Sequence, residues 1–397
     1  MSDAAAETGG LLPGRATQAG TRRYADRIIA RRREAGLPTA ADHFARPDEL
    51  WLSSLSLGTL RGDPGGVDDL LYRSVVGDLL EGGVNVFNTA LSDRMQTSER
   101  AIGHALRRAF AEGVVARDEV VVVTKGGGLT PDPERAGSYT SAQRDLYATY
   151  IDSGIVSPDD VYRGHSIDPG FLLDQIQRSR RNLGLETLDY YLIQEPEVHL
   201  KDRGVDGFKD ALKGAFEALE HAVEQRWIGA YGLCTWEGFL VPDTDRNHLG
   251  IVEVFEAALD VGQADHHLRA IQLPYGLAMG EGVALDSQLG PDGHSRAILD
   301  SLRDTGTAVF ASAPLYGGRL VGRVPEFVMR ALPEAPGQAL SALQFARSTA
   351  NVTSVVVGMR EAAHVEENLQ LVGIPRADPR IPATLFAVAA RGRDALA

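Results

Sequence analysis

The stretch VNVFNTALSDRMQTSERAIGHALRRAFAEG, residues 84–113, contains the repeating unit that decides the fold. Residues 84–90, VNVFNTA, form one of the short apolar runs that fit a strand buried on both faces. From residue 98 onward the apolar residues recur at helical spacing, and Ser98 is a residue type that caps helix N-termini. A buried strand that leads directly into an amphipathic helix predicts one unit of a parallel α/β sheet.

The same alternation runs through the chain. Apolar runs predict eight strands, at residues 54–59, 84–90, 119–125, 188–194, 228–235, 269–275, 307–315 and 353–359. Helical periodicity predicts helices at residues 68–83, 98–113, 168–184, 209–225, 294–306, 338–350 and 361–372. Eight strands with helices between them favour an α/β protein built as one (β/α)8 TIM barrel. The alternative is an open doubly wound sheet, but GTLRGDPGG at residues 58–66 lacks the G-x-G-x-x-G spacing of such dinucleotide sites.

The domain organisation follows from where the alternation begins. We expect residues 51–397 to form the single barrel domain with a C-terminal helix, and residues 1–50 to form an N-terminal extension. Within that extension we expect a disordered tail to residue 20 and a charged surface helix at residues 21–35. Two connections, residues 126–167 and 276–293, are long βα loops that would shape a pocket or, alternatively, decorate the surface.

Composition excludes several classes of protein. The net charge of −14 and the absence of a basic run argue against a nucleic-acid partner. No window of about 18 apolar residues predicts a membrane span, and the N-terminus lacks the apolar segment of a signal peptide, so we expect a cytoplasmic protein with a small-molecule substrate. The single cysteine, Cys234, excludes an internal disulfide and a Cys-rich metal site. No H-E-x-x-H spacing occurs, and no metal is expected.

Polar residues stand where the predicted strands end. In a (β/α)8 barrel these ends converge on one pocket. The expected ring consists of Thr59, Asn88, Lys125, Gln194, Cys234, Thr235, Gln272, Ser312 and Gly358. Gly317 and Gly318 follow the seventh strand, and Arg360 precedes the last helix, which is the usual position of a phosphate in such barrels. A phosphorylated cofactor or substrate is therefore expected.

Several segments resemble the aldo-keto reductase superfamily, over about residues 52–373. FNTALSDRMQTSE (87–99) is similar to the family pattern FDTAxxYGxxxSE, DYYLIQEP (189–196) to DxYLIHxP, and YGLCTW (231–236) to the IGVSNF segment. VVVVTK (120–125), IQLPY, SAPLYGGRL (312–320) and VVVGMREAAHVEENL (355–369) follow in the family's order. The wording is most similar to a bacterial, dehydrogenase-like branch. The resemblance implies a TIM barrel and an NAD(P)-dependent oxidoreductase.

The resemblance also locates the family's catalytic tetrad. A tyrosine that donates a proton falls on Asp93, and the lysine that lowers its pKa falls on Lys125. The aspartate that pairs with the lysine falls on Asn88, and the histidine that orients the carbonyl falls on Gln194. Only the lysine is retained, so the tetrad is degraded.

Each change alters the chemistry. Hydride delivery to a carbonyl creates an alkoxide that needs a proton, whereas an ionised Asp93 would repel it. Asn88 cannot balance Lys125 with charge, and Asp93 becomes the nearest new partner expected for the lysine. Gln194 can still donate a hydrogen bond to a carbonyl. The usual carbonyl reductase mechanism is not expected, and Asp93 is better suited to accept a proton during alcohol oxidation.

The resemblance also implies the cofactor contacts. NAD or NADP would lie against Cys234, Thr235, Gln272, Ser312, Leu315, Gly317, Gly318, Gly358, Arg360, His364, Glu367 and Asn368. Glu361 falls near the expected 2′-phosphate position and favours NAD by charge repulsion, while Arg360 favours NADP.

Three functions remain open at this point. The first is an aldo-keto-reductase-like enzyme for a small alcohol or carbonyl, with an altered proton path. The second is a non-redox dehydratase, isomerase or cyclase in which Lys125 is a base or Schiff-base amine and Asp93 and Glu195 are acid and base. The third is a catalytically silent protein that binds a cofactor or a partner.

Four further residues have a functional and a structural interpretation. Cys234 as a nucleophile is weighed against simple packing, and packing is favoured. His165 and His199 would contact substrate or, as we favour, only hydrogen-bond at helix starts. Trp236 would stack on a ligand ring or pack in the core.

Overall fold

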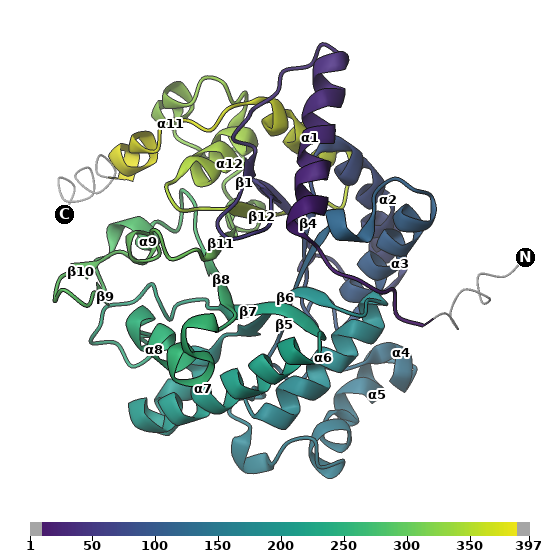
Figure 1. The fold of residues 1–397 in the computed structure, drawn as a ribbon, viewed down its shortest axis with the longest axis vertical. Helices are drawn as coiled ribbons and strands as arrows, with labels where there is room; N and C mark the ends of the chain where they lie inside the picture. Colours follow the sequence, from purple (N-terminus) through teal and green to yellow (C-terminus); the bar gives the residue numbers. More distant parts are fainter. Residues whose placement is uncertain (1–9, 387–397) are drawn as a thin grey trace, which may run out of the picture.

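Eight parallel strands close into a barrel in the computed structural model, which describes residues 10–386 (Figure 1). The order around the barrel is β11-β12-β3-β4-β5-β6-β7-β8. The strands are β3 (Leu55–Gly58), β4 (Val86–Asn88), β5 (Val121–Gly126), β6 (Leu188–Gln194), β7 (Ile228–Cys234), β8 (Leu268–Pro274), β11 (Ala308–Ser312) and β12 (Ser354–Gly358). The predicted (β/α)8 barrel is confirmed.

Helices surround the barrel and cover the outer faces of its strands. The main ones are α2 (Gly66–Gly82), α3 (Thr97–Ala111), α6 (Pro169–Leu183), α7 (Leu200–Glu224), α8 (Ile251–Gly262), α12 (Gln338–Ser348) and α13 (Ala362–Leu369). Two helices differ from the prediction. The segment of α8 is rich in β-branched residues, which lower helix propensity, and its periodicity was not among the predicted helices. The helix predicted at residues 294–306 is only α10 (Ile298–Ser301), because Arg296 pairs with Gln288 in a short hairpin.

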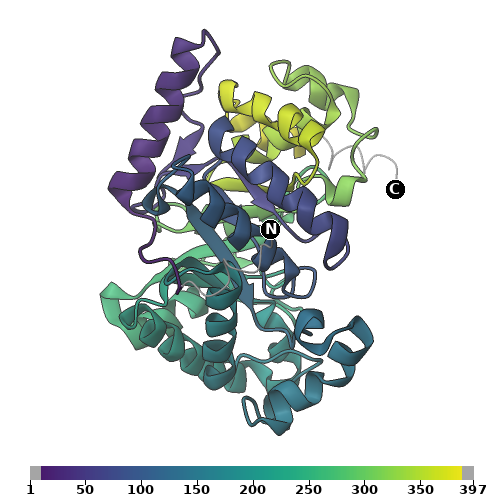
Figure 2. The ribbon, with the colours of Figure 1, turned by 90° about the vertical axis from the view of Figure 1, so that its right-hand side faces the viewer.

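The N-terminal extension is packed more closely than predicted. Residues 10–17 are not free: Leu12 bridges to Leu185, and the Ala16 amide donates to Asp189 Oδ1 at 2.7 Å. Helix α1 (Gln18–Glu34) begins before residue 20 and buries Tyr24 and its apolar neighbours on one face. It lies along the outside of the barrel (Figure 2). The expectation of a disordered segment to residue 20 is therefore wrong for residues 10–20, whereas the charged helix does lie on the surface, with one of its faces buried.

Charge explains why α1 docks although its sequence is polar. Arg23 Nε and Arg27 Nη1 donate to Glu119 Oε1 at 2.9 and 2.6 Å. After α1, strand β1 (Phe44–Ala45) pairs with β2 (Leu52–Ser53) in an antiparallel hairpin just before β3.

The two long connections carry structure of their own. Residues 127–168 include α4 (Pro133–Ala136) and α5 (Tyr139–Arg144), which lie near α6 in Figure 1. This segment has a small core in which Tyr150 packs against Phe171. The second connection contains α9 (Glu281–Ala284) and the hairpin of β9 (Gln288–Leu289) and β10 (Ser295–Arg296), and α11 (Glu326–Ala331) follows β11.

Two statements concern the rest of the described chain. Between residues 10 and 386, no helix combines the length and the apolar character needed to cross a membrane. Residues 380–386 are helical, and the remainder of the predicted C-terminal helix lies outside the described residues.

The barrel interior changes from apolar to polar at its carboxyl end. Alternate residues of a strand share a face, so the residue two places after an interior apolar residue also faces inward. The apolar interior includes Val86, Val123, Leu192, Ala270 and Phe310. Two positions later the same strands carry Asn88, Lys125, Gln194, Gln272 and Ser312. The strand register places Gln194, Cys234 and Gln272 side by side, as the predicted ring requires.

Candidate active site

Lys125 is held by two oxygens at the centre of the polar ring. Its Nζ donates to Asn88 Oδ1 and to the Thr89 carbonyl, both at 2.6 Å, and the side chain is only 5% exposed. Asn88 in turn donates from Nδ2 to Gln272 Oε1 at 2.9 Å. Asn88 therefore still positions the lysine, but through a neutral amide.

Asp93 lies near Lys125 but does not bond to it. The Thr59 hydroxyl donates to Asp93 Oδ2 at 2.8 Å and is equally far from the Thr89 hydroxyl. Burial raises the pKa of Asp93, which is 6% exposed, and the attraction of Lys125 opposes this rise. The expected pairing of Asp93 with Lys125 is corrected. The charge of Lys125 attracts the Asp93 carboxylate without a hydrogen bond, and the hydrogen-bond partner of Asp93 is Thr59.

A strained turn orients Asp93. Arg94, Met95 and Gln96 have φ values of 48°, 54° and 71°, a left-handed conformation that non-glycine residues rarely adopt. Buried Arg94 anchors the turn, because its guanidinium donates to the Asp63 carbonyl at 2.7 Å and to Asp69 at 2.5 Å. The anchor holds a backbone conformation that the family pattern alone would not predict.

Gln194 connects this centre to its surroundings. Ser92 Oγ donates to Gln194 Oε1 at 2.9 Å, and Gln194 also bonds to the side chain of Glu195. Partial desolvation raises the pKa of Glu195, and the charge of Glu237 adds to the effect. Glu195 is exposed, and its backbone has a left-handed conformation with φ of 49°. Among the described residues it makes no hydrogen bond or ion pair to Lys125 or Asp93. It faces a separate cavity.

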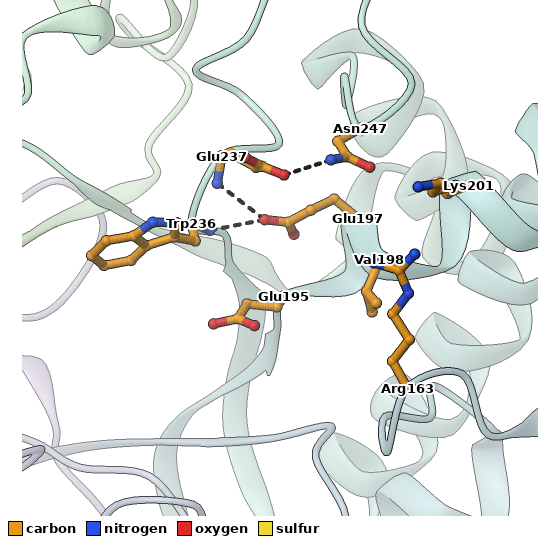
Figure 3. A pocket seen from close by; sticks show the side chains of 8 residues that line it. All are labelled: Arg163, Glu195, Glu197, Val198, Lys201, Trp236, Glu237 and Asn247. Carbon is orange, nitrogen blue, oxygen red and sulfur yellow. Dashed lines mark hydrogen bonds between the residues drawn. The ribbon is translucent and has the colours of Figure 1, made fainter.

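That cavity, which we call the acidic side cavity, has a volume of about 430 Å³ (Figure 3). Its walls come from the loops after β6 and β7 and from the long connection before α6. It is lined by Arg163, Glu195, Glu197, Val198, Lys201, Trp236, Glu237 and Asn247. Trp236 is thus an exposed wall residue and not part of the core.

His165 and His199 form a structural pair behind the site. His165 lies 2.5 Å from the Gln194 carbonyl through Nε2 and 2.9 Å from His199 through Nδ1. Burial lowers the pKa of His165 to about 4 and that of His199 to about 3. Both are therefore neutral near pH 7 and support the end of β6, in agreement with the structural interpretation.

The nicotinamide side of the expected cofactor site offers unpartnered polar groups. Thr235 Oγ1 is buried without a hydrogen-bond partner among the described residues, and the Thr235 amide donates to the Gln272 carbonyl at 3.0 Å. Asn88 occupies only the Oε1 of Gln272, which leaves the Gln272 amide nitrogen as a donor. A carboxamide would satisfy both groups, so these residues fit a nicotinamide. Burial raises the pKa of Cys234 to about 12, so it is a neutral thiol and not a nucleophile.

The phosphate side is open and rich in glycine. Gly317 and Gly318 have φ of 67° and 86°, and both are exposed with Gly358. A Cβ at Gly317 would lie 2.2 Å from Arg61 Nη2, so this guanidinium rests on the glycine loop. Backbone amides and a nearby cation suit a pyrophosphate.

The adenine side is less uniform. Arg360 Nη1 lies 3.2 Å from Asp68 Oδ1, and its Nε lies 4.0 Å from Glu361. His364 is exposed on α13, whereas Asn368 is buried and Glu367 partly buried. Leu315 and Ser312 are partly buried at the end of β11. Asp68 and Glu361 therefore compete for Arg360, the cation that was expected to favour NADP.

Comparison with known proteins agrees with this geometry. Residues 54–240 match the aldo/keto reductase family model. The chain is 26% identical over 334 residues to D-threo-aldose 1-dehydrogenase of a Pseudomonas species, covering 79% of this chain and 85% of that protein. Over residues 54–240 the barrel is thus similar to the aldo/keto reductase family.

Solved aldo-keto reductases share the fold at low identity. The glycerol dehydrogenase of Gluconobacter oxydans superposes with a TM-score of 0.60 at 17% identity, over 88% of this chain and 96% of that one. An aldo-keto reductase of Klebsiella pneumoniae, solved with NADP and acetate, gives a TM-score of 0.52 at 18% identity, over 88% and 95% of the two chains.

Some residues of this site were not found by sequence reasoning. Thr89 and Ser92 bond to Lys125 and Gln194, Arg61 covers the glycine loop, and Glu197 lines the side cavity. Only Thr89 and Ser92 carried a signal, because they lie inside the FNTALSD motif. Within residues 10–386, no group of three or more His, Cys, Asp or Glu side chains is arranged to hold a metal ion.

Proposed function

We propose that the chain is an NAD(P)-dependent oxidoreductase that oxidises a small organic alcohol, with Asp93 as the proton acceptor. The observation that carries this proposal is that the buried carboxyl of Asp93 lies near the buried Lys125 at the carboxyl end of the barrel. At the same end, Thr235 after β7 and Gln272 on β8 could bind a carboxamide. The name of the Pseudomonas relative, an aldose dehydrogenase, supports oxidation of an alcohol.

In this proposal the residues of the chain bind, orient and deprotonate the alcohol. When bound, NAD(P)+ would supply the hydride acceptor. The substrate O–H proton would move to the Asp93 carboxylate while the bound dinucleotide would accept the hydride from the same carbon, and Asp93 would then release its proton to the solvent. Lys125 stabilises the developing alkoxide, and Gln194 donates a hydrogen bond to the same oxygen.

The pH dependence tests the role of Asp93. Since only the carboxylate can accept a proton, kcat/KM for oxidation is expected to fall with unit slope as the pH drops below the raised pKa of Asp93. Carbonyl reduction needs the protonated form and should rise over the same interval. The measurement is the initial rate in both directions against pH. If both rates ran parallel, Asp93 would not be the group that exchanges the proton.

Cofactor preference is expected to lie with NAD. Asp68 and Glu361 surround Arg360 with negative charge, which disfavours a 2′-phosphate. Changing Asp68→Asn should free Arg360 and tighten NADP binding relative to NAD by about threefold to tenfold. Calorimetric titration with NAD+ and NADP+ measures the ratio. Asp78→Asn, an exposed position on the same helix, is the matched control and should leave the ratio unchanged.

A further inference from the structure

The acidic side cavity adjoins the catalytic centre and is not used by the mechanism above. Glu195 follows Gln194 directly at the end of β6, and its amide donates to the Cys234 carbonyl at 2.6 Å. Trp236 and Glu237 follow β7 and face the cavity from the other side (Figure 3). A substrate that reaches Gln194 would therefore extend beside these side chains.

One carboxylate oxygen in the cavity lacks a partner. Glu197 is 4% exposed, and its Oε1 accepts the amides of Trp236, Glu237 and Gly238 at 2.8, 3.2 and 3.3 Å. Its Oε2 is buried and accepts no hydrogen bond from the part of the chain that the structure describes. In Figure 3 this oxygen points away from the amides, toward the side on which Glu195 lies. A buried acceptor without a donor is costly, and a ligand donor would satisfy it.

Among the described residues, the three glutamates of the cavity form no ion pair. Glu195, Glu197 and Glu237 line one cavity, and within residues 10–386 the side chain of Glu237 accepts a hydrogen bond from the neutral amide of Asn247 and forms no ion pair. Arg163 and Lys201 lie in the same wall, but among the described residues neither forms an ion pair with these glutamates. The three carboxylates are not grouped as a metal site. Three carboxylates stand against two cations in this wall, so an organic cation would complement the remaining negative charge.

Trp236 adds a second element of cation recognition. Its side chain is 50% exposed beside the acidic residues, so a ligand can reach the indole. The face of an indole attracts an ammonium group, and this attraction adds to that of nearby carboxylates.

We propose that the acidic side cavity binds the ammonium group of an amine-bearing substrate, such as an amino sugar or amino alcohol, with Glu195, Glu197 and Glu237 as acceptors and Trp236 as an aromatic wall. Its role as a substrate subsite rests on the proposed function. Burial raises the pKa of Glu197 and partial desolvation raises that of Glu195, and no Arg or Lys charge opposes either rise.

The test compares matched ligands that differ in charge. The probes are D-glucosamine against N-acetyl-D-glucosamine, and 5-amino-1-pentanol against 1,5-pentanediol, titrated calorimetrically at pH 7 and low salt into the full chain without cofactor. We expect at least one amine to bind about tenfold more tightly than its uncharged match. Glu195→Gln and Glu237→Gln should each reduce this preference by about threefold or more. Glu217→Gln, an exposed position on α7, should not change it.

Equal binding of both members of each pair, or preference unchanged in the Glu195→Gln and Glu237→Gln variants, would overturn the proposal. A separate titration with NAD+ keeps the two proposals distinguishable. Amine preference without dinucleotide binding would retain the cation site and reject the oxidoreductase. Dinucleotide binding and alcohol turnover without amine preference would do the reverse.

Discussion

Changing Asp93→Asn is expected to lower kcat/KM for alcohol oxidation by about 10²- to 10⁴-fold, the usual contribution of a general base. The same change should raise the melting temperature at neutral pH. Asparagine keeps an acceptor for the Thr59 hydroxyl but removes a buried charge whose pKa is raised by desolvation. Initial rates and thermal unfolding of the same preparation measure both effects.

The pH dependence of the stability gain follows from linkage. Because the pKa of Asp93 is higher in the folded chain than in the unfolded chain, the folded state holds the proton more tightly. The penalty for ionised Asp93 grows as the pH rises from the unfolded to the folded pKa and is fully present above it. The advantage of the asparagine variant should therefore appear at neutral pH and vanish in acid. Asp210→Asn on exposed α7 is the control, and a loss of both stability and activity at position 93 would indicate a structural role instead.

Changing Lys125→Met is expected to reduce turnover by about 10²- to 10³-fold, as for other preorganised charges at an oxyanion. It also leaves Asn88 Oδ1 and the Thr89 carbonyl without their donor, which costs about 1–3 kcal/mol for each group that becomes unsatisfied. Steady-state rates and denaturant unfolding measure the two losses. Lys209→Met on α7 should change neither.

Lys125→Arg separates electrostatic from covalent roles. A guanidinium keeps the positive charge, so this variant should retain more activity than Lys125→Met if the lysine stabilises an alkoxide. A Schiff-base enzyme would be inactive in both variants, and borohydride treatment with substrate would add mass at Lys125. The two short hydrogen bonds that Lys125 donates favour the electrostatic role.

The barrel and the polar ring could be predicted because both depend on periodicity. Continuous apolar strands and alternating helices define the (β/α)8 order, and a period of two along each strand places Asn88, Lys125, Gln194 and Gln272 at one end. These features are local to each segment. They do not depend on contacts between distant parts of the chain.

The partners of the site residues could not be predicted for the opposite reason. Thr59 reaches Asp93 only because the left-handed turn at residues 94–96 directs the carboxyl, and that turn depends on Arg94 meeting Asp63 and Asp69. Likewise, the sequence of α1 predicts a charged surface helix, but it does not show that Glu119, in a distant segment, pairs with Arg23 and Arg27.

The neutral hydrogen bond from Lys125 to Asn88 separates the positioning of the lysine from the exchange of a proton. A single ion pair would combine these two roles. An amide neither gains nor loses a proton over the range in which enzymes operate, so Asn88 holds Lys125 in the same way whether or not Asp93 is charged. Because Asn88 also donates a hydrogen bond to Gln272, it connects Lys125 to the residues of the expected cofactor site. In the proposed reaction Asp93 gains and loses the proton. The position of Lys125 therefore does not change with the protonation state of Asp93.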